Sequence, residues 1–276
     1  MKRLTLPCGE TVPALGQGTW NIGDDPRQRA EEIATIRRGL DLGLTLIDTA
    51  EMYGDGRSER LVGDAIAGRR HEVFLVSKVY PHNAAPRAMR RACEASLRRL
   101  RVDTLDLYLL HWPGEVPLAE TVEGFEALQR EGKIRHWGVS NFDPQWMEDL
   151  WSLPGGEAAQ VNQVLYNLGC RGVEWDLLPA LRERHVPLMA YSPLDQARLL
   201  RRRELVAFAR ARGMTPAQLA LAWLLAQDVI AIPKTGHAQR LEENFAALQR
   251  PLARDELAEL DGLFAPPEGP TPLAML

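Results

Sequence analysis

The amino-acid sequence predicts an α/β protein: a (β/α)8 TIM barrel, in one domain over residues 1–276, with an N-terminal β-hairpin that caps the barrel bottom. Short apolar runs alternate with amphipathic segments along the chain, which is typical of repeated βα units and a parallel sheet. Eight such runs occur, and 276 residues is an ordinary length for a barrel of this kind. No internal repeat or low-complexity linker interrupts the pattern, so we expect a single domain.

The predicted elements follow in order from the amino terminus. The stretch LTLPCGETVPALG, residues 4–16, has Gly9 between two short apolar runs and predicts the hairpin. Eight apolar runs, most of them ending in polar side chains, predict the barrel strands. These strands are expected near residues 14–20, 44–49, 73–79, 105–112, 136–141, 159–165, 186–192 and 229–234.

Two of the segments between strands carry clear helix signals. Residues 215–227 begin with Thr215 as a cap and Pro216 at the first helical position. In residues 87–100 a mostly apolar stripe of side chains, spaced as on one face of a helix, is expected to face the sheet, while arginines occupy the rest of the helix surface. The stripe contains Met89, Cys93, Ser96, Leu97 and Leu100. The proline-rich tail, residues 265–276, is expected to be irregular.

Composition restricts the class of protein. A formal net charge of −4 gives no reason to expect nucleic acid or an anionic membrane as partner. No run approaches the roughly 18–20 apolar residues that span a bilayer, and the start lacks the apolar segment of a secretory signal. Cys8, Cys93 and Cys170 are odd in number and lack metal-site spacing, which predicts reduced thiols and no metal. We therefore expect a cytoplasmic protein, and a monomer because no pattern marks an interface.

Lysine is rare in this chain and falls at positions of interest. Lysine and arginine together number 33, but lysine occurs only at positions 2, 78, 133 and 234. Lys78 and Lys234 each stand at the end of a predicted strand. Arginine cannot replace a compact ammonium that takes part in proton exchange, so both lysines are candidates for function.

Polar or aromatic groups follow the apolar runs at the ends of all eight predicted strands. Reactive groups of such barrels collect at the carboxyl ends of the strands, so we expect these side chains to meet on one face. They are Trp20, Asp48, Lys78, His111, Ser140–Asn141, Asn162–Gln163, Tyr191–Ser192 and Lys234–Thr235.

An acid, a lysine, a histidine and a tyrosine at one face suggest proton transfer to an oxygen. An isolated tyrosine has a pKa near 10, and a neighbouring ammonium lowers it. We expect Lys78 to lower the pKa of Tyr53, Asp48 to hold Lys78, and His111 to orient a carbonyl oxygen. A tuned Tyr53 then protonates the oxygen while hydride reaches the carbon, a contribution of about 10² to 10⁴ in rate.

The same segments resemble the aldo-keto reductase family. The segments LIDTAEMYGDG, VSKV, LYLLHWP, GVSNF, NQVLYN, AYSPL and IPKT follow the family's motifs in order across nearly the whole chain. In detail they are most similar to short prokaryotic members, some of which reduce methylglyoxal and other small aldehydes. The resemblance implies NADPH-dependent reduction of aldehydes and ketones by Asp48, Tyr53, Lys78 and His111, with Tyr53 as proton donor. It also implies NADPH binding without a Rossmann domain, and no G-x-G-x-x-G occurs here.

The resemblance further implies the cofactor-binding residues. Tyr191 stacks on the nicotinamide ring, and its carboxamide is bound by Ser140, Asn141 and Gln163. The pyrophosphate is contacted by Ser192 and Leu194, and the adenine by Asn244. The adenosine 2′-phosphate is held by Lys234, Thr235 and Arg240.

Two cations, a hydroxyl and a helix N-terminus suit a phosphate, which favours NADP over NAD. The segment IPKT keeps the hydroxyl of the family's frequent IPKS, whereas the following Gly236–His237 differs from many relatives.

The substrate is expected to be a small carbonyl compound. The resemblance places Trp20, Tyr80 and Trp112 around it, and aromatic walls with few polar groups suit a small apolar body. Longer relatives close this pocket with their C-terminal tail. The tail after Phe264 is short, so we expect a more open site.

Other functions remain open from the residues. Asp48 and Lys78 can form a purely structural ion pair, although such buried pairs are often costly. Lys78 can also form a Schiff base, as in lyases of the aldolase type, but the implied cofactor residues have no role there. A cofactor-binding regulatory subunit with little turnover is a further alternative. A metal-dependent hydrolase is disfavoured because no His-x-His pair stands at a strand end.

Overall fold

A computed structural model describes residues 1–276 and contains the expected eight-stranded parallel sheet. Each strand pairs in parallel with the next one along the chain. The strands are β3 (Gln17–Gly18), β4 (Leu46–Asp48), β5 (Phe74–Val79), β6 (Leu105–Leu110), β7 (Ile134–Ser140), β8 (Asn162–Leu165), β9 (Leu188–Tyr191) and β10 (Ile230–Ala231).

The first and last strands close this sheet into a barrel. The Gly16 N–H donates to the Ala231 carbonyl over 2.8 Å, and the Gly18 N–H donates to the Pro233 carbonyl over 3.0 Å. A Cβ at Gly18 would lie 2.6 Å from the main-chain oxygen of Ile232, so this approach requires glycine. The (β/α)8 prediction is confirmed. β3 and β10 are shorter than predicted because isolated bridges, not a continuous ladder, join them.

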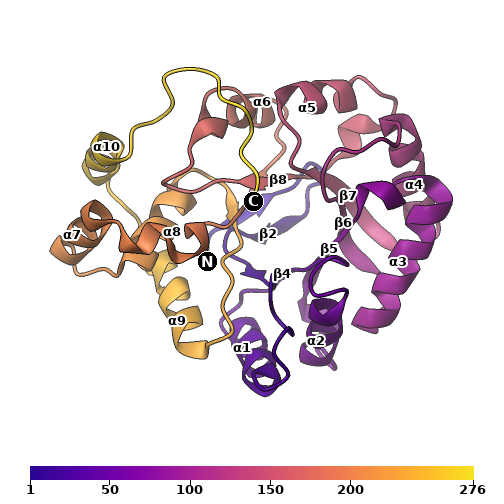
Figure 1. Ribbon diagram of the computed structural model, residues 1–276, viewed down its shortest axis with the longest axis horizontal. Helices are drawn as coiled ribbons and strands as arrows, with labels where there is room; N and C mark the ends of the chain where they lie inside the picture. Colours follow the sequence, from indigo (N-terminus) through magenta and orange to yellow (C-terminus); the bar gives the residue numbers. More distant parts are fainter.

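Helices surround the barrel (Figure 1). Consecutive strands from β3 to β9 are connected by α1 (Arg29–Asp41), α2 (Arg57–Ala65), α3 (Pro86–Leu100), α4 (Leu118–Arg130), α5 (Pro144–Trp151) and α6 (Leu177–Glu183). Two helices precede β10 and two follow it: α7 (Arg203–Ala211), α8 (Pro216–Ala226), α9 (Ala238–Ala246) and α10 (Arg254–Leu263). The predicted cap of α8 is confirmed, since Thr215 Oγ1 accepts the Gln218 N–H over 3.2 Å. None of the helices has the length and apolar character needed to cross a membrane.

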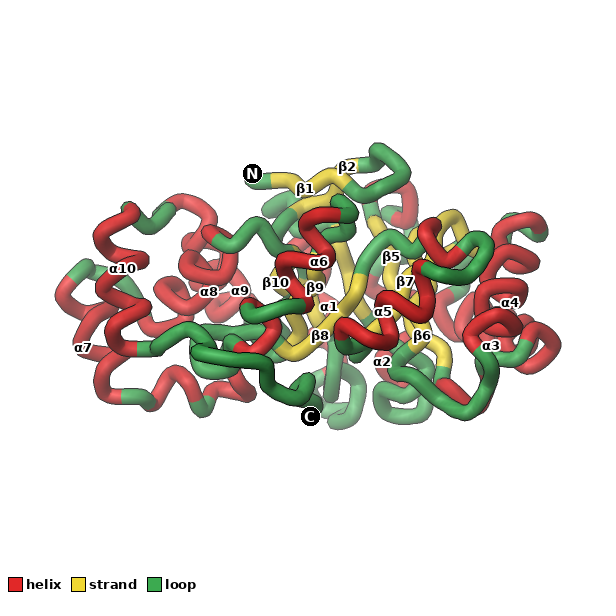
Figure 2. The backbone as a smooth tube through the Cα atoms, turned by 90° about the horizontal axis from the view of Figure 1, so that it is seen from above, coloured by secondary structure: helices red, strands yellow, loops and turns green.

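The predicted hairpin lies across one end of the barrel. β1 (Arg3–Thr5) pairs antiparallel with β2 (Thr11–Pro13), and Figure 2 shows the pair at the opposite end from the C-terminus. Leu6 and Val12 are buried and pack with the barrel's interior side chains, among them Leu107 and Met189. The bottom of the barrel is therefore filled, which leaves the carboxyl ends of the strands as the face for a ligand.

The C-terminal tail covers part of that face. Residues 265–276 contain no helix or strand, as expected. Residues 271–274 line a small cavity together with Pro144 and Cys170, and the main chain of Leu276 lies near the Tyr191 hydroxyl. Figure 1 shows the C-terminus over the middle of the barrel. The short irregular tail thus still reaches the barrel mouth, while the expectation of a more open site stays a prediction.

Candidate active site

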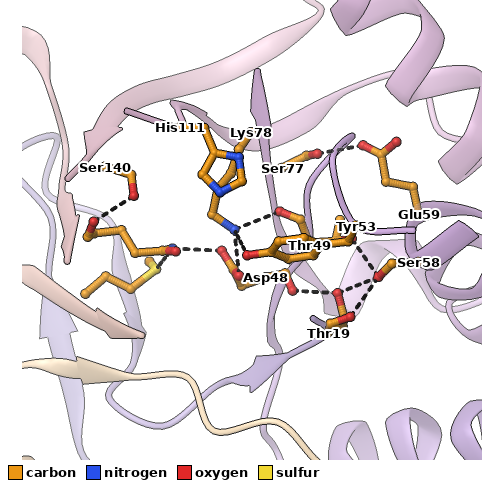
Figure 3. A network of polar contacts seen from close by, with 12 residues as sticks. Thr19, Asp48, Thr49, Tyr53, Ser58, Glu59, Ser77, Lys78, His111 and Ser140 are labelled. Carbon is orange, nitrogen blue, oxygen red and sulfur yellow. Dashed lines mark hydrogen bonds and ion pairs between the residues drawn. The ribbon is translucent and has the colours of Figure 1, made fainter. Parts of the chain in front are cut away.

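Three neighbouring strands bring the predicted catalytic residues to one edge of the barrel (Figure 3). Asp48 is the last residue of β4, Lys78 is the next to last of β5, and His111 directly follows β6. Tyr53 lies on the turn between β4 and α2. The carboxyl ends of adjacent parallel strands meet, so side chains far apart in sequence converge here.

The glycines beside Tyr53 shape its turn. Gly54 has a φ of +56° and Gly56 a φ of +78°, which glycine adopts without strain. The Tyr53 carbonyl accepts the Gly56 N–H over 3.2 Å and the Ser58 N–H over 3.3 Å. This tight turn returns the chain towards the end of β4, and the Tyr53 hydroxyl reaches Lys78.

The ammonium of Lys78 is the centre of the site. Its Nζ donates to Asp48 Oδ2 over 2.8 Å, to the Thr49 carbonyl over 3.0 Å and to the Tyr53 hydroxyl over 3.0 Å. The Lys78 side chain is fully buried and that of Asp48 is 2% exposed. All three donors of the ammonium are used, so one of them is held on the tyrosine oxygen.

The charges of the site differ from the expectation in one respect. Burial raises the pKa of Tyr53 above 10, and the opposing charge of Lys78 does not cancel that rise. The prediction that Lys78 lowers this pKa below its ordinary value is therefore wrong, because sequence alone does not reveal the desolvation. Burial by itself lowers the pKa of Lys78, but Asp48 and Tyr53 together raise it. At neutral pH the pair is a neutral phenol beside an ammonium.

His111 is neutral and stands at the edge of Tyr53. Burial, helped by the charge of Lys78, lowers the pKa of His111 to about 2. Its ring centroid lies 5.9 Å from that of Tyr53 in an edge-on arrangement, and its Nδ1 is buried without a hydrogen-bond partner. A neutral imidazole has one N–H to donate, which suits contact with a carbonyl oxygen.

A buried polar network beneath the site was not predicted from the sequence. Ser58 Oγ donates to Thr19 Oγ1 over 2.8 Å, and Thr19 Oγ1 donates to the Asp48 carbonyl over 2.8 Å. Glu59, fully buried, accepts Ser77 Oγ over 2.6 Å (Figure 3). It also pairs with Arg99. Polar residues on the inward face of α2 were the signal that could have revealed this network.

The residues predicted for the nicotinamide form a second group joined to the first. Gln163 Nε2 donates to Asp48 Oδ1 over 2.8 Å, and Ser140 Oγ donates to the Gln163 carbonyl over 2.7 Å. The Tyr191 hydroxyl donates to Asn141 Oδ1 over 3.0 Å. Burial raises the pKa of Tyr191 to about 12, so this tyrosine is also neutral. Ser192 and Leu194, the predicted pyrophosphate contacts, follow β9 and are half-buried.

The residues predicted for the 2′-phosphate form a third group at the start of α9. Lys234 and Arg240 are exposed, and neither has a hydrogen-bond or ion-pair partner. Thr235 Oγ1 accepts the His237 N–H over 3.1 Å, while Asn244 is buried in α9. No hydrogen bond joins this group to Lys78.

Two of the three predicted substrate contacts form an aromatic wall beside His111. Trp112 lies 4.9 Å from His111 and 5.8 Å from Tyr80 between ring centroids. Tyr80 also stacks on His82 at 4.8 Å, a contact absent from the predictions. Trp20 follows β3, is 43% exposed and makes no aromatic contact with that wall.

Known proteins resemble this chain over nearly its full length. Residues 14–265 match the model of the "Aldo/keto reductase family". The methylglyoxal reductase YeaE of Escherichia coli (strain K12) is 51% identical over 272 residues, which cover 96% of each chain.

Two solved structures share the fold. An aldo-keto reductase from Klebsiella pneumoniae in complex with NADPH has 51% identity and a TM-score of 0.96, with 100% of both chains covered. An aldo/keto reductase from the same organism, in complex with NADP and acetate, has 50% identity and a TM-score of 0.97, covering 100% of this chain and 99% of its own.

Proposed function

This chain belongs to the aldo/keto reductase family and reduces carbonyl groups with NADPH, and we propose that it acts on small aldehydes such as methylglyoxal with Tyr53 as the proton donor. The observation that carries the proposal is the hydrogen bond from Lys78 Nζ to the Tyr53 hydroxyl, 3.0 Å long and formed beside a neutral His111.

The roles of the catalytic residues follow from their charges. NADPH, when bound, supplies a hydride to the carbonyl carbon. Tyr53 donates its phenolic proton to the carbonyl oxygen as negative charge develops there. The phenolate that remains lies within hydrogen-bond distance of the Lys78 ammonium, which stabilises it. Asp48 keeps that ammonium charged, and the neutral ring of His111 donates a hydrogen bond to the same oxygen.

The side chains suit a phosphorylated dinucleotide. Lys234 and Arg240 have no partners, and the first N–H groups of α9 are free because its first helical bond is from Leu241 to His237. Unpaired cations at a free helix N-terminus suit the 2′-phosphate. The hydroxyl of Ser140 and the amides of Asn141 and Gln163 suit a carboxamide, and Tyr191 offers a ring for stacking.

The aromatic wall supports a small substrate. Tyr80 and Trp112 stand next to His111, so a short carbonyl compound can contact them while its oxygen meets Tyr53. The tail end at Tyr191 further limits the space. The E. coli relative is named a methylglyoxal reductase, and methylglyoxal has the small size that this wall suits.

A Schiff-base mechanism is not favoured. It requires a neutral amine, but Asp48 and Tyr53 keep the pKa of Lys78 above its ordinary value despite burial. We also propose that the chain acts as a monomer of one domain in the cytoplasm. Size-exclusion chromatography with light scattering tests this, and the mass of two chains would contradict it.

The test is NADPH consumption with methylglyoxal, other short aldehydes and bulkier ketones. We expect the highest kcat/KM with the short aldehydes. Preference for bulky ketones would refute the substrate class, and no turnover by a protein that binds NADPH would refute the reductase. Borohydride treatment with substrate should add no mass to Lys78, since a trapped adduct would support the lyase.

A further inference from the structure

We propose a zinc site at the bottom of the barrel, formed by Cys8, Glu10 and His136. Cys8 and Glu10 belong to the hairpin loop between β1 and β2, and His136 lies in the first half of β7. Figure 2 shows this hairpin at the opposite end from the C-terminus, so the site is remote from Lys78 and Tyr53. Reduction of a carbonyl does not use it.

The distances between the three ligand atoms suit one tetrahedral ion. Cys8 Sγ lies 3.7 Å from His136 Nε2, and that nitrogen lies 3.2 Å from Glu10 Oε2. All three ligand atoms lie within 4.8 Å of one another. With Zn–S near 2.3 Å and Zn–N or Zn–O near 2.0–2.1 Å, the edges of a tetrahedron are about 3.6 Å and 3.3 Å. Two of the three edges are therefore already close to those of a metal site.

The chemistry of the donors favours zinc over hard cations. A thiolate, an imidazole nitrogen and a carboxylate are the ligands Zn²⁺ takes, whereas Ca²⁺ and Mg²⁺ take oxygen. Binding releases the Cys8 thiol proton to solvent, so a thiolate and a carboxylate face the ion. Glu10 shares its charge with Arg135, which also pairs with Asp106. Cys8 is exposed, so the ion has a path from solvent, and water can complete the tetrahedron.

Neighbouring groups already position the ligands. Gln160 Oε1 accepts the Cys8 N–H over 2.9 Å, which fixes the loop against the barrel. Arg135 donates to both oxygens of Glu10, over 3.1 Å and 2.8 Å, and also to Asp106 over 2.9 Å. Hydrogen bonds of this kind orient the ligands of metal sites, and each Glu10 oxygen keeps a lone pair for the ion.

A bound ion would connect the hairpin to β7. The sequence analysis predicted no metal because His136 lies more than a hundred residues from Cys8 and Glu10, and only the fold brings it to them. Zinc in this position adds a cross-link at the barrel bottom, so it raises the stability of the fold and leaves catalysis unchanged.

The test uses Co²⁺ as a spectroscopic probe and Zn²⁺ for stability, on the full chain. We expect one Co²⁺ per chain with a thiolate charge-transfer band, displaced by Zn²⁺, and a Tm raised by about 5 °C or more when Zn²⁺ is in large excess over Kd. Cys8→Ser should abolish the band, and His136→Gln should weaken binding at least about 10-fold. NADPH turnover of both variants should equal that of the wild type, which shows that they fold.

Cys170→Ser is the matched control, since Cys170 is partly exposed but lies on the opposite face beside the tail. It should keep the band and the rise in Tm. A band that survives Cys8→Ser, loss of the band in Cys170→Ser, or no metal binding at all would overturn the proposal. Each of these results leaves the reductase assignment intact, so the two proposals fail separately.

Discussion

The ammonium of Lys78 donates a hydrogen bond of 3.0 Å to the hydroxyl of Tyr53, and its ion pair with Asp48 is buried. In this arrangement burial keeps the Tyr53 phenol neutral, and the Lys78 ammonium lies beside the phenolic oxygen. In the proposed mechanism this keeps the Tyr53 proton available at neutral pH, and Lys78 stabilises the phenolate after the proton has left.

Lys78→Met should lose turnover and stability together. The substitution leaves the Asp48 carboxylate buried without its cation, which costs about 3–5 kcal/mol in the free energy of unfolding. The double variant Asp48→Asn/Lys78→Met should recover most of that stability but no activity. Urea unfolding and NADPH consumption measure the two effects.

Lys133→Met is the matched control for Lys78. Lys133 forms ion pairs with Glu94 and Glu131 at the surface, and such pairs contribute about 0–1 kcal/mol. A Lys78→Met protein as stable as this control would show that Asp48 does not depend on its cation.

His111→Gln should change how stability depends on pH. The folded pKa of His111 is lowered to about 2, while the unfolded value is about 6.5. Below pH 6.5 the unfolded chain therefore binds a proton that the folded chain does not, and wild-type stability falls by up to about 1.4 kcal/mol per pH unit. Glutamine does not titrate, so the variant lacks this loss.

Unfolding of both proteins at pH 7.5 and 4.5 tests the prediction. The difference in unfolding free energy between them should shift by about 2–3 kcal/mol in favour of the variant at the lower pH. The carboxylates common to both proteins cancel in this comparison. A difference that does not change with pH would mean that folding does not lower the pKa of His111.

Arg240→Ala should weaken NADPH far more than NADH. Loss of one charge-assisted hydrogen bond to the 2′-phosphate costs about 1.5–3 kcal/mol, or roughly 10- to 150-fold in Kd. NADH lacks that phosphate and should bind almost unchanged. Fluorescence titration measures both affinities, with Arg250→Ala as control, because Arg250 donates to the main chain of Arg212 instead. Equal weakening of both cofactors would assign Arg240 another role.

The sequence predicted the barrel and the convergence of Asp48, Lys78 and His111, because parallel strands place their carboxyl ends at one edge. It did not predict the direction in which the pKa of Tyr53 shifts, since desolvation depends on the packing around the turn. The ion pair between Glu59 and Arg99 could not be predicted, because the sequence of α2 does not show that Glu59 is buried or that Arg99 of α3 lies beside it. The path of residues 265–276 could not be predicted either, because an irregular segment has no periodic pattern of apolar residues.

The measurement that tests the central claim most directly compares Tyr53→Phe with the wild type and with Tyr108→Phe. Tyr108 is buried and its hydroxyl has no hydrogen-bond partner, so its substitution controls for the loss of a phenolic oxygen. NADPH consumption with methylglyoxal should fall by about 10² to 10⁴ in Tyr53→Phe alone, with NADPH affinity unchanged in all three proteins. Wild-type turnover in Tyr53→Phe would show that another group donates the proton.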